Sequence, residues 1–86
     1  MPIAYILLNS DLGTDESVIT KIKNILSDEK DAQYEIQGVY GVYDIILKLI
    51  SNNPENLRAI ITNKIRNLKN IQSTLTMIVI EEQEKP

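Results

Sequence analysis

The hydrophobic residues of this 86-residue chain switch between a strand period and a helix period, and the order of these segments limits the fold. Compact or alternating apolar runs predict β-strands, whereas apolar residues at helical spacing predict amphipathic helices. Strands are predicted at residues 3–8, 33–40, 43–50 and 73–80. Helices are predicted after the first and the third strand, and their apolar stripes are Val18, Ile19, Ile22, Ile25, Leu26 and Leu57, Ile60, Ile61, Ile65, Leu68.

Turn and capping residues support these boundaries. Thr14 or Asp15 suits the N-cap of the first helix, and Asn53 followed by Pro54 suits the start of the second. The second and third strands are close enough in sequence to form a hairpin through the region of Gly41. The order strand, helix, strand, strand, helix, strand predicts an α+β fold of the ferredoxin-like βαββαβ type. In that fold, four antiparallel strands carry both helices on one face. The domain is assigned to residues 1–82, and residues 83–86 to an acidic tail.

Both faces of the predicted sheet are apolar, although two helices cover only one of them. Apolar residues occupy both sets of alternate positions in the first strand and in the last. In the first strand the two sets are Ile3, Tyr5, Leu7 and Ala4, Ile6, Leu8. In the last strand they are Leu75, Met77, Val79 and Ile78, Ile80. An apolar sheet face without a cover normally marks an interface. The pattern therefore predicts a homodimer packed sheet to sheet. The alternative is that the strands are assigned one residue out of place.

Composition excludes several classes of function. The formal net charge is −3, and the chain contains neither histidine nor cysteine. The commonest general base, nucleophile and metal ligands are therefore missing, so we expect no enzyme, no metal and no cofactor. The densest basic residues, Lys64, Arg66 and Lys69, are more typical of a solvated helix face than of a nucleic-acid footprint. The apolar runs are too short to span a membrane, and no secretory signal is visible, which predicts a cytoplasmic location.

Two motifs resemble a known family. Gly41-Val42-Tyr43-Asp44 followed by IILKLI, together with TLTMIV from Thr74, resembles the effector-binding RAM domain of the Lrp/AsnC (feast/famine) regulators over residues 3–82. The resemblance implies dimers through the sheets, assembly into octamers or decamers, and an amino acid or similar effector bound between dimers. Gly41, Tyr43 and Asp44 then correspond to the effector loop, and Thr74 and Thr76 to strand positions near the same cleft.

The resemblance also implies partners. Family regulators carry an N-terminal helix-turn-helix domain, whereas this chain begins at the first strand of the sensor. It therefore resembles the stand-alone form, which would modulate full-length Lrp/AsnC regulators by mixed assembly and would not bind DNA itself.

The role of Asp44 stays open at the level of residues. An ionised Asp44 would accept charge-assisted hydrogen bonds from the ammonium of an amino-acid effector. Gly38 and Gly41 would let backbone amides approach the carboxylate of the effector closely. The hydroxyls of Thr74 and Thr76 would complete a polar rim around it. Alternatively, Asp44 caps the hairpin through local backbone N–H groups, and the glycines serve turn geometry.

Other functions fit the same element order. An ACT-like regulatory domain would carry its ligand at the first strand–helix loop, near Leu12 and Gly13. A dimeric α/β-barrel enzyme, such as a small monooxygenase, is disfavoured by the absence of histidine. A purely structural oligomer would bind no ligand at all.

Overall fold

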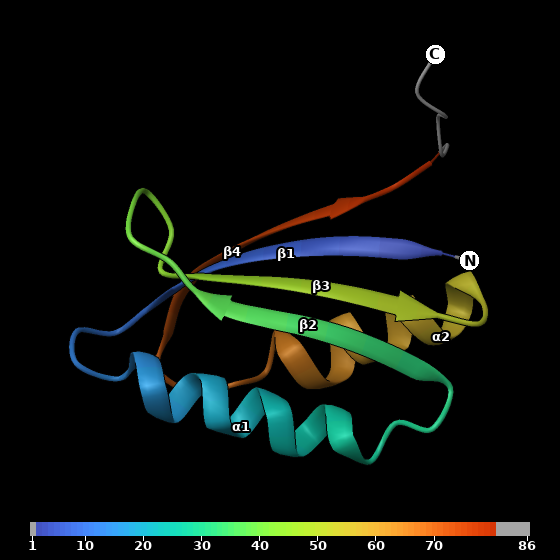
Figure 1. Cartoon of the computed structure of the whole chain (residues 1–86), viewed down its shortest axis with the longest axis horizontal. Coiled ribbons are helices and arrows are strands. Elements are labelled where there is room, and N and C mark those ends of the chain that lie inside the picture. The colour runs from blue at the N-terminus through green and yellow to red at the C-terminus, as the bar shows by residue number, and fades with distance from the viewer. Residues whose placement is uncertain (1, 81–86) are drawn as a thin grey trace.

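The computed structural model describes residues 2–80, which form one sheet with its helices on one side (Figure 1). The elements are β1 (Ile3–Ser10), α1 (Asp15–Ser27), β2 (Ala32–Gly38), β3 (Ile45–Ser51), α2 (Pro54–Ile60), the π-helical turn η1 (Ile61–Ile65) and β4 (Ile71–Ile78). The predicted element order and the ferredoxin-like fold class are confirmed. The predicted acidic tail, residues 83–86, lies outside the described residues.

The four strands lie in the order β2-β3-β1-β4, and every neighbouring pair is antiparallel. The two strands that precede the helices, β1 and β3, therefore form the centre of the sheet. Leu7 of β1 lies between Ile46 of β3 and Leu75 of β4 in the register. Gly38 pairs with Ile45, which closes the predicted hairpin between β2 and β3. Both crossovers carry their helices past the same face of the sheet (Figure 1).

Strand pairing changes the predicted ends of all four strands. β1 continues to Ser10 rather than ending at residue 8, and β2 spans Ala32–Gly38 rather than residues 33–40. β3 begins at Ile45 rather than at residue 43, because the chain at residues 39–44 turns away from the sheet, and its two ends are joined by a bond from the Val39 N–H to the Asp44 carbonyl (2.7 Å). β4 spans Ile71–Ile78 rather than residues 73–80. Its start is fixed by β1, whose Ser10 pairs with Ile71 beyond a bulge that the alternation of β4 does not reveal.

The two helix starts differ in their capping. Thr14 occupies the N-cap of α1, but its hydroxyl donates to the Asp11 carbonyl at 2.7 Å and makes no side-chain cap. The prediction for α2 is confirmed, since the Asn53 side chain accepts the backbone N–H of Asn56 at 2.7 Å and Pro54 follows it. α2 therefore begins with one of its free N–H groups satisfied.

Replacing the cap of α2 tests this assignment. Asn53→Ala is expected to lower the free energy of unfolding by about 1 kcal/mol, because the Asn56 N–H loses its acceptor. Chemical denaturation followed by circular dichroism measures the change. The neighbouring Asn52→Ala removes only an exposed 3.4 Å bond to Asp31 and should change stability by less than about 0.5 kcal/mol. Equal losses in both variants would contradict the capping role.

The core lies between the sheet and the helices. Its buried apolar side chains are Ala4, Ile6, Leu8, Val18, Ile22, Leu26, Ile45, Leu47, Leu49, Leu57, Ile60, Ile61 and Ile65. The π turn keeps the second stripe on the sheet side. In η1 the Arg66 N–H donates to the Ile61 carbonyl (3.0 Å), and this wider turn buries Ile65 while Lys64 stays exposed. Within residues 2–80 no helix is long and apolar enough to cross a membrane.

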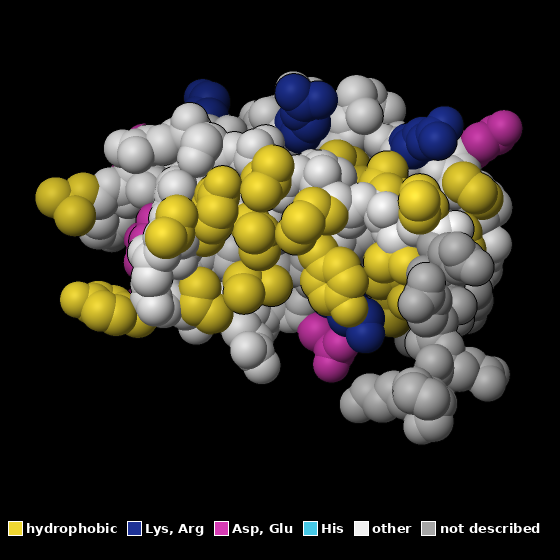
Figure 2. Space-filling view, turned by 90° about the horizontal axis from the view of Figure 1, so that it is seen from above, with side chains coloured by type: hydrophobic (Ala, Val, Ile, Leu, Met, Phe, Trp, Pro, Cys, Tyr) yellow, Lys and Arg dark blue, Asp and Glu magenta, His cyan; other side chains and the backbone are white. Residues whose placement is uncertain are grey.

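The side of the sheet away from the helices has no cover among residues 2–80, and we call it the open face. In β1 the residues that alternate with the buried Ala4, Ile6 and Leu8 are half-buried and point to this side. The register adds their directly paired neighbours, which face the same way. The apolar side chains of the open face are Ile3, Tyr5, Leu7, Ile46, Ile50, Leu75 and Met77. Figure 2 shows hydrophobic side chains gathered over this side. The predicted alternation of β1 is confirmed.

Candidate functional site

Three loops meet at one end of the sheet. Because the strands are antiparallel, the ends of β1 and β2 lie beside the starts of β3 and β4, as the pairs Leu8–Ile45 and Ser10–Ile71 show. The loops at residues 11–14, 39–44 and 66–70 therefore leave the sheet at the same end, and Figure 1 shows the first two projecting there. Tyr43 and Asp44 belong to the loop at 39–44, which we call the hairpin loop.

Asp44 joins the hairpin loop to the central strand. Its backbone N–H donates to the Leu8 carbonyl at 3.0 Å, and its carboxylate oxygen Oδ2 accepts the Ser10 backbone N–H at 3.1 Å. The second bond is long-range, so Asp44 does bind backbone N–H, but on β1 rather than within its own hairpin. One carboxylate oxygen is thereby fixed in place, and the half-buried Asp44 side chain is held at the base of the loop.

The tip of the hairpin loop is exposed, and no contact or backbone angle among residues 2–80 requires its glycine. Tyr40 is fully exposed and Val42 is 85% exposed, so neither packs against the described residues. Gly41 has no positive φ, and a Cβ built on it meets no atom within 4 Å. Neither backbone strain nor crowding within residues 2–80 therefore explains a glycine at this position. A close approach from outside the subunit would explain it.

The remaining predicted site residues, Gly38, Thr74 and Thr76, lie at different distances from the hairpin loop. Gly38 ends β2 and faces α1, where an added Cβ would be 3.4 Å from the Ile19 side chain. Thr74 and Thr76 share one face, as predicted from the strand period, but it is the helix side, because they pair with Leu8 and Ile6. Thr74 lies at the loop end of the sheet, across β1 from Asp44. Two strand spacings put them about 10 Å apart. The structure thus brings together Gly41, Tyr43 and Asp44 in the hairpin loop, with Thr74 nearby. Gly38 faces α1, and Thr76 lies farther from the loop along β4.

Ser10 also belongs to the candidate site, although the sequence analysis did not single it out. It is 6% exposed, its backbone binds Asp44, and its hydroxyl donates to Asp15 Oδ1 at 2.5 Å. Ser10 therefore ties the end of β1 to both the hairpin loop and the first turn of α1. In the sequence it is a polar residue after an apolar run, with nothing to distinguish it from Asn9. Only the register places it beside Asp44.

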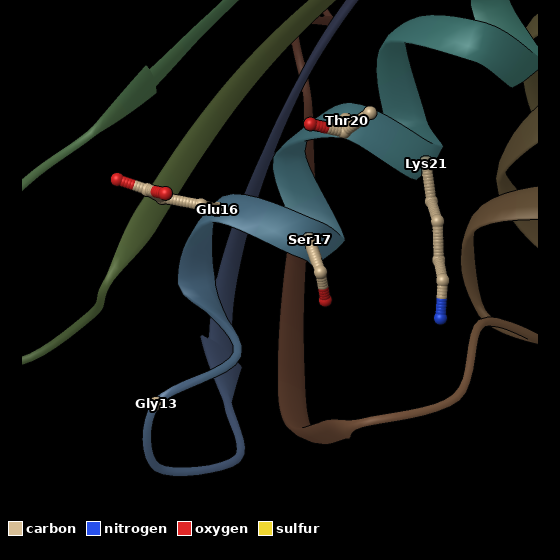
Figure 3. A pocket seen from close by; sticks show the side chains of 5 residues that line it. All are labelled: Gly13, Glu16, Ser17, Thr20 and Lys21. Carbon is tan, nitrogen blue, oxygen red and sulfur yellow. The ribbon is translucent and has the colours of Figure 1, made fainter.

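The first strand–helix loop, where an ACT-like domain would bind its ligand, borders a shallow depression. It is lined by Gly13, Glu16, Ser17, Thr20 and Lys21, all of them exposed. Figure 3 shows the Ser17 and Lys21 side chains directed to one side of α1, and Glu16 and Thr20 to another. Gly13 has a φ of +80°, so its glycine is explained by the turn. Among residues 2–80 no group of three or more carboxylates, histidines or cysteines is placed to hold a metal.

The architecture is that of a small ferredoxin-like domain whose loops and bare sheet face are its exposed features. The family model described as the Lrp/AsnC ligand binding domain matches residues 4–85. The chain therefore belongs to the Lrp/AsnC ligand-binding domain family, as the two motifs predicted. No match is found among curated proteins.

Solved structures agree with this assignment. FFRP-DM1 is 35% identical, with 93% of this chain and 100% of that chain covered and a TM-score of 0.75. The hypothetical protein PHS023 from Pyrococcus horikoshii is 36% identical, with 95% and 93% covered and a TM-score of 0.77. A transcriptional regulator from Neisseria meningitidis, solved as a complex with L-Met, is 11% identical, with 98% and 53% covered and a TM-score of 0.69. At that identity the likeness shows the fold alone. Membership of this family indicates a regulatory rather than an enzymatic role.

Proposed function

We propose that this chain is a sensory domain that binds an amino acid, or a closely related metabolite, at the hairpin loop. The observation that carries the proposal is the placement of Asp44 in the same loop as Gly41, a glycine that neither strain nor crowding within residues 2–80 explains. Ser10 holds one oxygen of the Asp44 carboxylate, at 3.1 Å. An ammonium group brought to this loop end would donate a charge-assisted hydrogen bond to the carboxylate.

The opposite end of an amino acid is a carboxylate, and the loop tip offers backbone N–H groups for it. With no Cβ at Gly41, a ligand can approach the main chain closely. Tyr43, half-buried beside Asp44, and the hydroxyl of Thr74 complete the proposed contacts. The family assignment supports the class of ligand, and the Neisseria meningitidis regulator solved with L-Met provides an example within the fold.

The proposed site is completed by other subunits. Two copies pack through their open faces, which removes the apolar side chains from water. The exposed Tyr40 and Val42 then lie at an edge where a neighbouring dimer covers them, so that the effector sits between dimers. In this arrangement the effector regulates assembly, and the partners are further copies of the chain or related regulators. Two statements stay predictions: the domain itself does not bind DNA, and its location is cytoplasmic.

A ligand screen tests the function directly. The melting temperature is measured with each of the twenty amino acids in turn. A ligand at 100 times its dissociation constant is expected to add about 2.7 kcal/mol to the free energy of unfolding. Calorimetry with the responding amino acid then gives the stoichiometry per subunit. Amino-acid sensing is abandoned if no member of the set, nor any related metabolite, raises the melting temperature.

A further inference from the structure

Among residues 2–80 the strands of the open face carry one pair of opposite charges, and their other side chains on this face are apolar or uncharged. Among its described strand residues, the charged ones are Lys48 of β3 and Glu35 of β2, which pair directly in the register. On its other side Lys48 pairs with Tyr5 of β1. The polar residues Gln33, Glu35 and Gln37 line β2, so the apolar surface is confined to β3, β1 and β4 and ends at this charged pair.

Lys48 has weak partners within its own subunit. Its ammonium lies 3.7 Å from the Glu35 carboxylate, which is a long ion pair rather than a hydrogen bond. It also lies 6.0 Å from the centre of the Tyr5 ring, at the outer limit for a cation–π contact. The Lys48 side chain is 32% exposed and that of Glu35 is 72% exposed, so water now solvates both charges.

Packing a second sheet onto the open face removes water from Lys48. An apolar partner surface would leave the ammonium desolvated and poorly paired, which is costly. A surface that presents a carboxylate would compensate for the loss. The same surface on another copy of this chain presents one, namely Glu35. In a two-fold symmetric contact, if Lys48 meets Glu35 of the partner subunit, then Glu35 meets Lys48 of the partner subunit.

We propose that Lys48 and Glu35 form a four-charge cluster with the same two residues of a second copy, and that this cluster restricts association to partners with matching charges. The inference rests on the sheet-to-sheet dimer proposed above and adds its specificity determinant. The apolar residues supply the driving force, which is indifferent to partner identity, whereas the alternating charges fix the register and reject faces of the wrong sign.

Charge reversal separates the two contributions. Lys48→Glu leaves two negative charges on each face, and Glu35→Lys leaves two positive charges. Each variant alone is expected to self-associate at least about tenfold more weakly than the wild type, because like charges meet across the interface. An equimolar mixture of the two variants should form the heterodimer in preference to either homodimer. The double variant K48E/E35K should recover self-association, and salt should reduce all these differences.

Sedimentation equilibrium measures the dissociation constants, and native mass spectrometry counts the heterodimer in the mixture. Lys21→Glu and Glu16→Lys make the same charge changes on the exposed surface of α1 and should leave self-association unchanged. Recovery in the mixture requires folded subunits, so a folding defect does not imitate the expected result. Self-association of both single variants at wild-type strength, or a statistical mixture, would overturn the charge cluster while leaving the dimer intact. A wild type that sediments as a monomer would overturn both the cluster and the proposed dimer.

Discussion

A Leu7→Glu substitution is expected to turn the proposed dimer into a folded monomer. Leu7 lies at the middle of the open face, directly between Ile46 and Leu75. If this face packs against a second copy, its apolar surface contributes on the order of 10 kcal/mol before the costs of association. A glutamate at this position places an unpaired charge in the contact, and two-fold symmetry brings two of them together. The dimer dissociation constant should rise at least about a hundredfold.

Sedimentation equilibrium at micromolar concentration measures this change. The molecular mass in solution should fall from twice the chain mass of 9.8 kDa to the mass of a single chain. The fold should survive, because the glutamate stays in water when the subunit is alone. Thr20→Glu adds the same charge on the exposed surface of α1, outside the open face, and should preserve the dimer. A Leu7→Glu variant that still sediments as a dimer would exclude the open face as the contact surface.

Loss of the Asp44 carboxylate is expected to abolish the stabilisation by whichever amino acid gives it in the wild type. Removing one partner of a hydrogen-bonded charge pair costs about 2 to 5 kcal/mol of binding free energy. The dissociation constant should therefore rise at least about thirtyfold. Calorimetry with Asp44→Ala measures this change. Asp44→Asn keeps an acceptor for the Ser10 N–H and removes only the charge, so it separates ligand recognition from anchoring of the loop.

The matched control for Asp44 is Glu16, a carboxylate in the depression beside the first strand–helix loop. Glu16→Gln should leave the ligand response unchanged if the hairpin loop is the site. The converse result, in which Glu16→Gln removes the response and Asp44→Asn retains it, would move the site to the loop that an ACT-like domain uses. Unchanged binding in both variants would exclude both carboxylates.

Much of the fold follows from local patterns in the sequence. The alternation of Ala4, Ile6 and Leu8 with their neighbours determined the two faces of β1, and Asn53-Pro54 determined where α2 begins. The helical stripes were recognisable from their spacing, and all of their members are buried or half-buried in the structure. The sequence offered Thr14 or Asp15 as the cap of α1. Thr14 does occupy the N-cap, but its side chain makes no cap bond, because its hydroxyl donates to the Asp11 carbonyl instead.

The candidate site was only partly accessible to sequence reasoning. Gly41, Tyr43 and Asp44 are adjacent in the chain, so their proximity needed no tertiary information. Ser10 was missed because it is 34 positions from Asp44 in the chain and meets it only across the sheet. The side of the sheet that Thr74 occupies depends on the strand it pairs with, and alternation alone states only that Thr74 and Thr76 share a face.

By itself the sequence determined the element order, the two-sided apolar character of the first strand and the family motifs, because each of these depends on residues that are neighbours in the chain. The tertiary structure alone decided the strand ends, the bond between Ser10 and Asp44, and the row that carries Glu35, Lys48 and Tyr5 side by side. The physical reason is that strand register is a long-range property. It is set by how the whole sheet buries its apolar face, and a shift of one residue would exchange every side chain between the core and the open face.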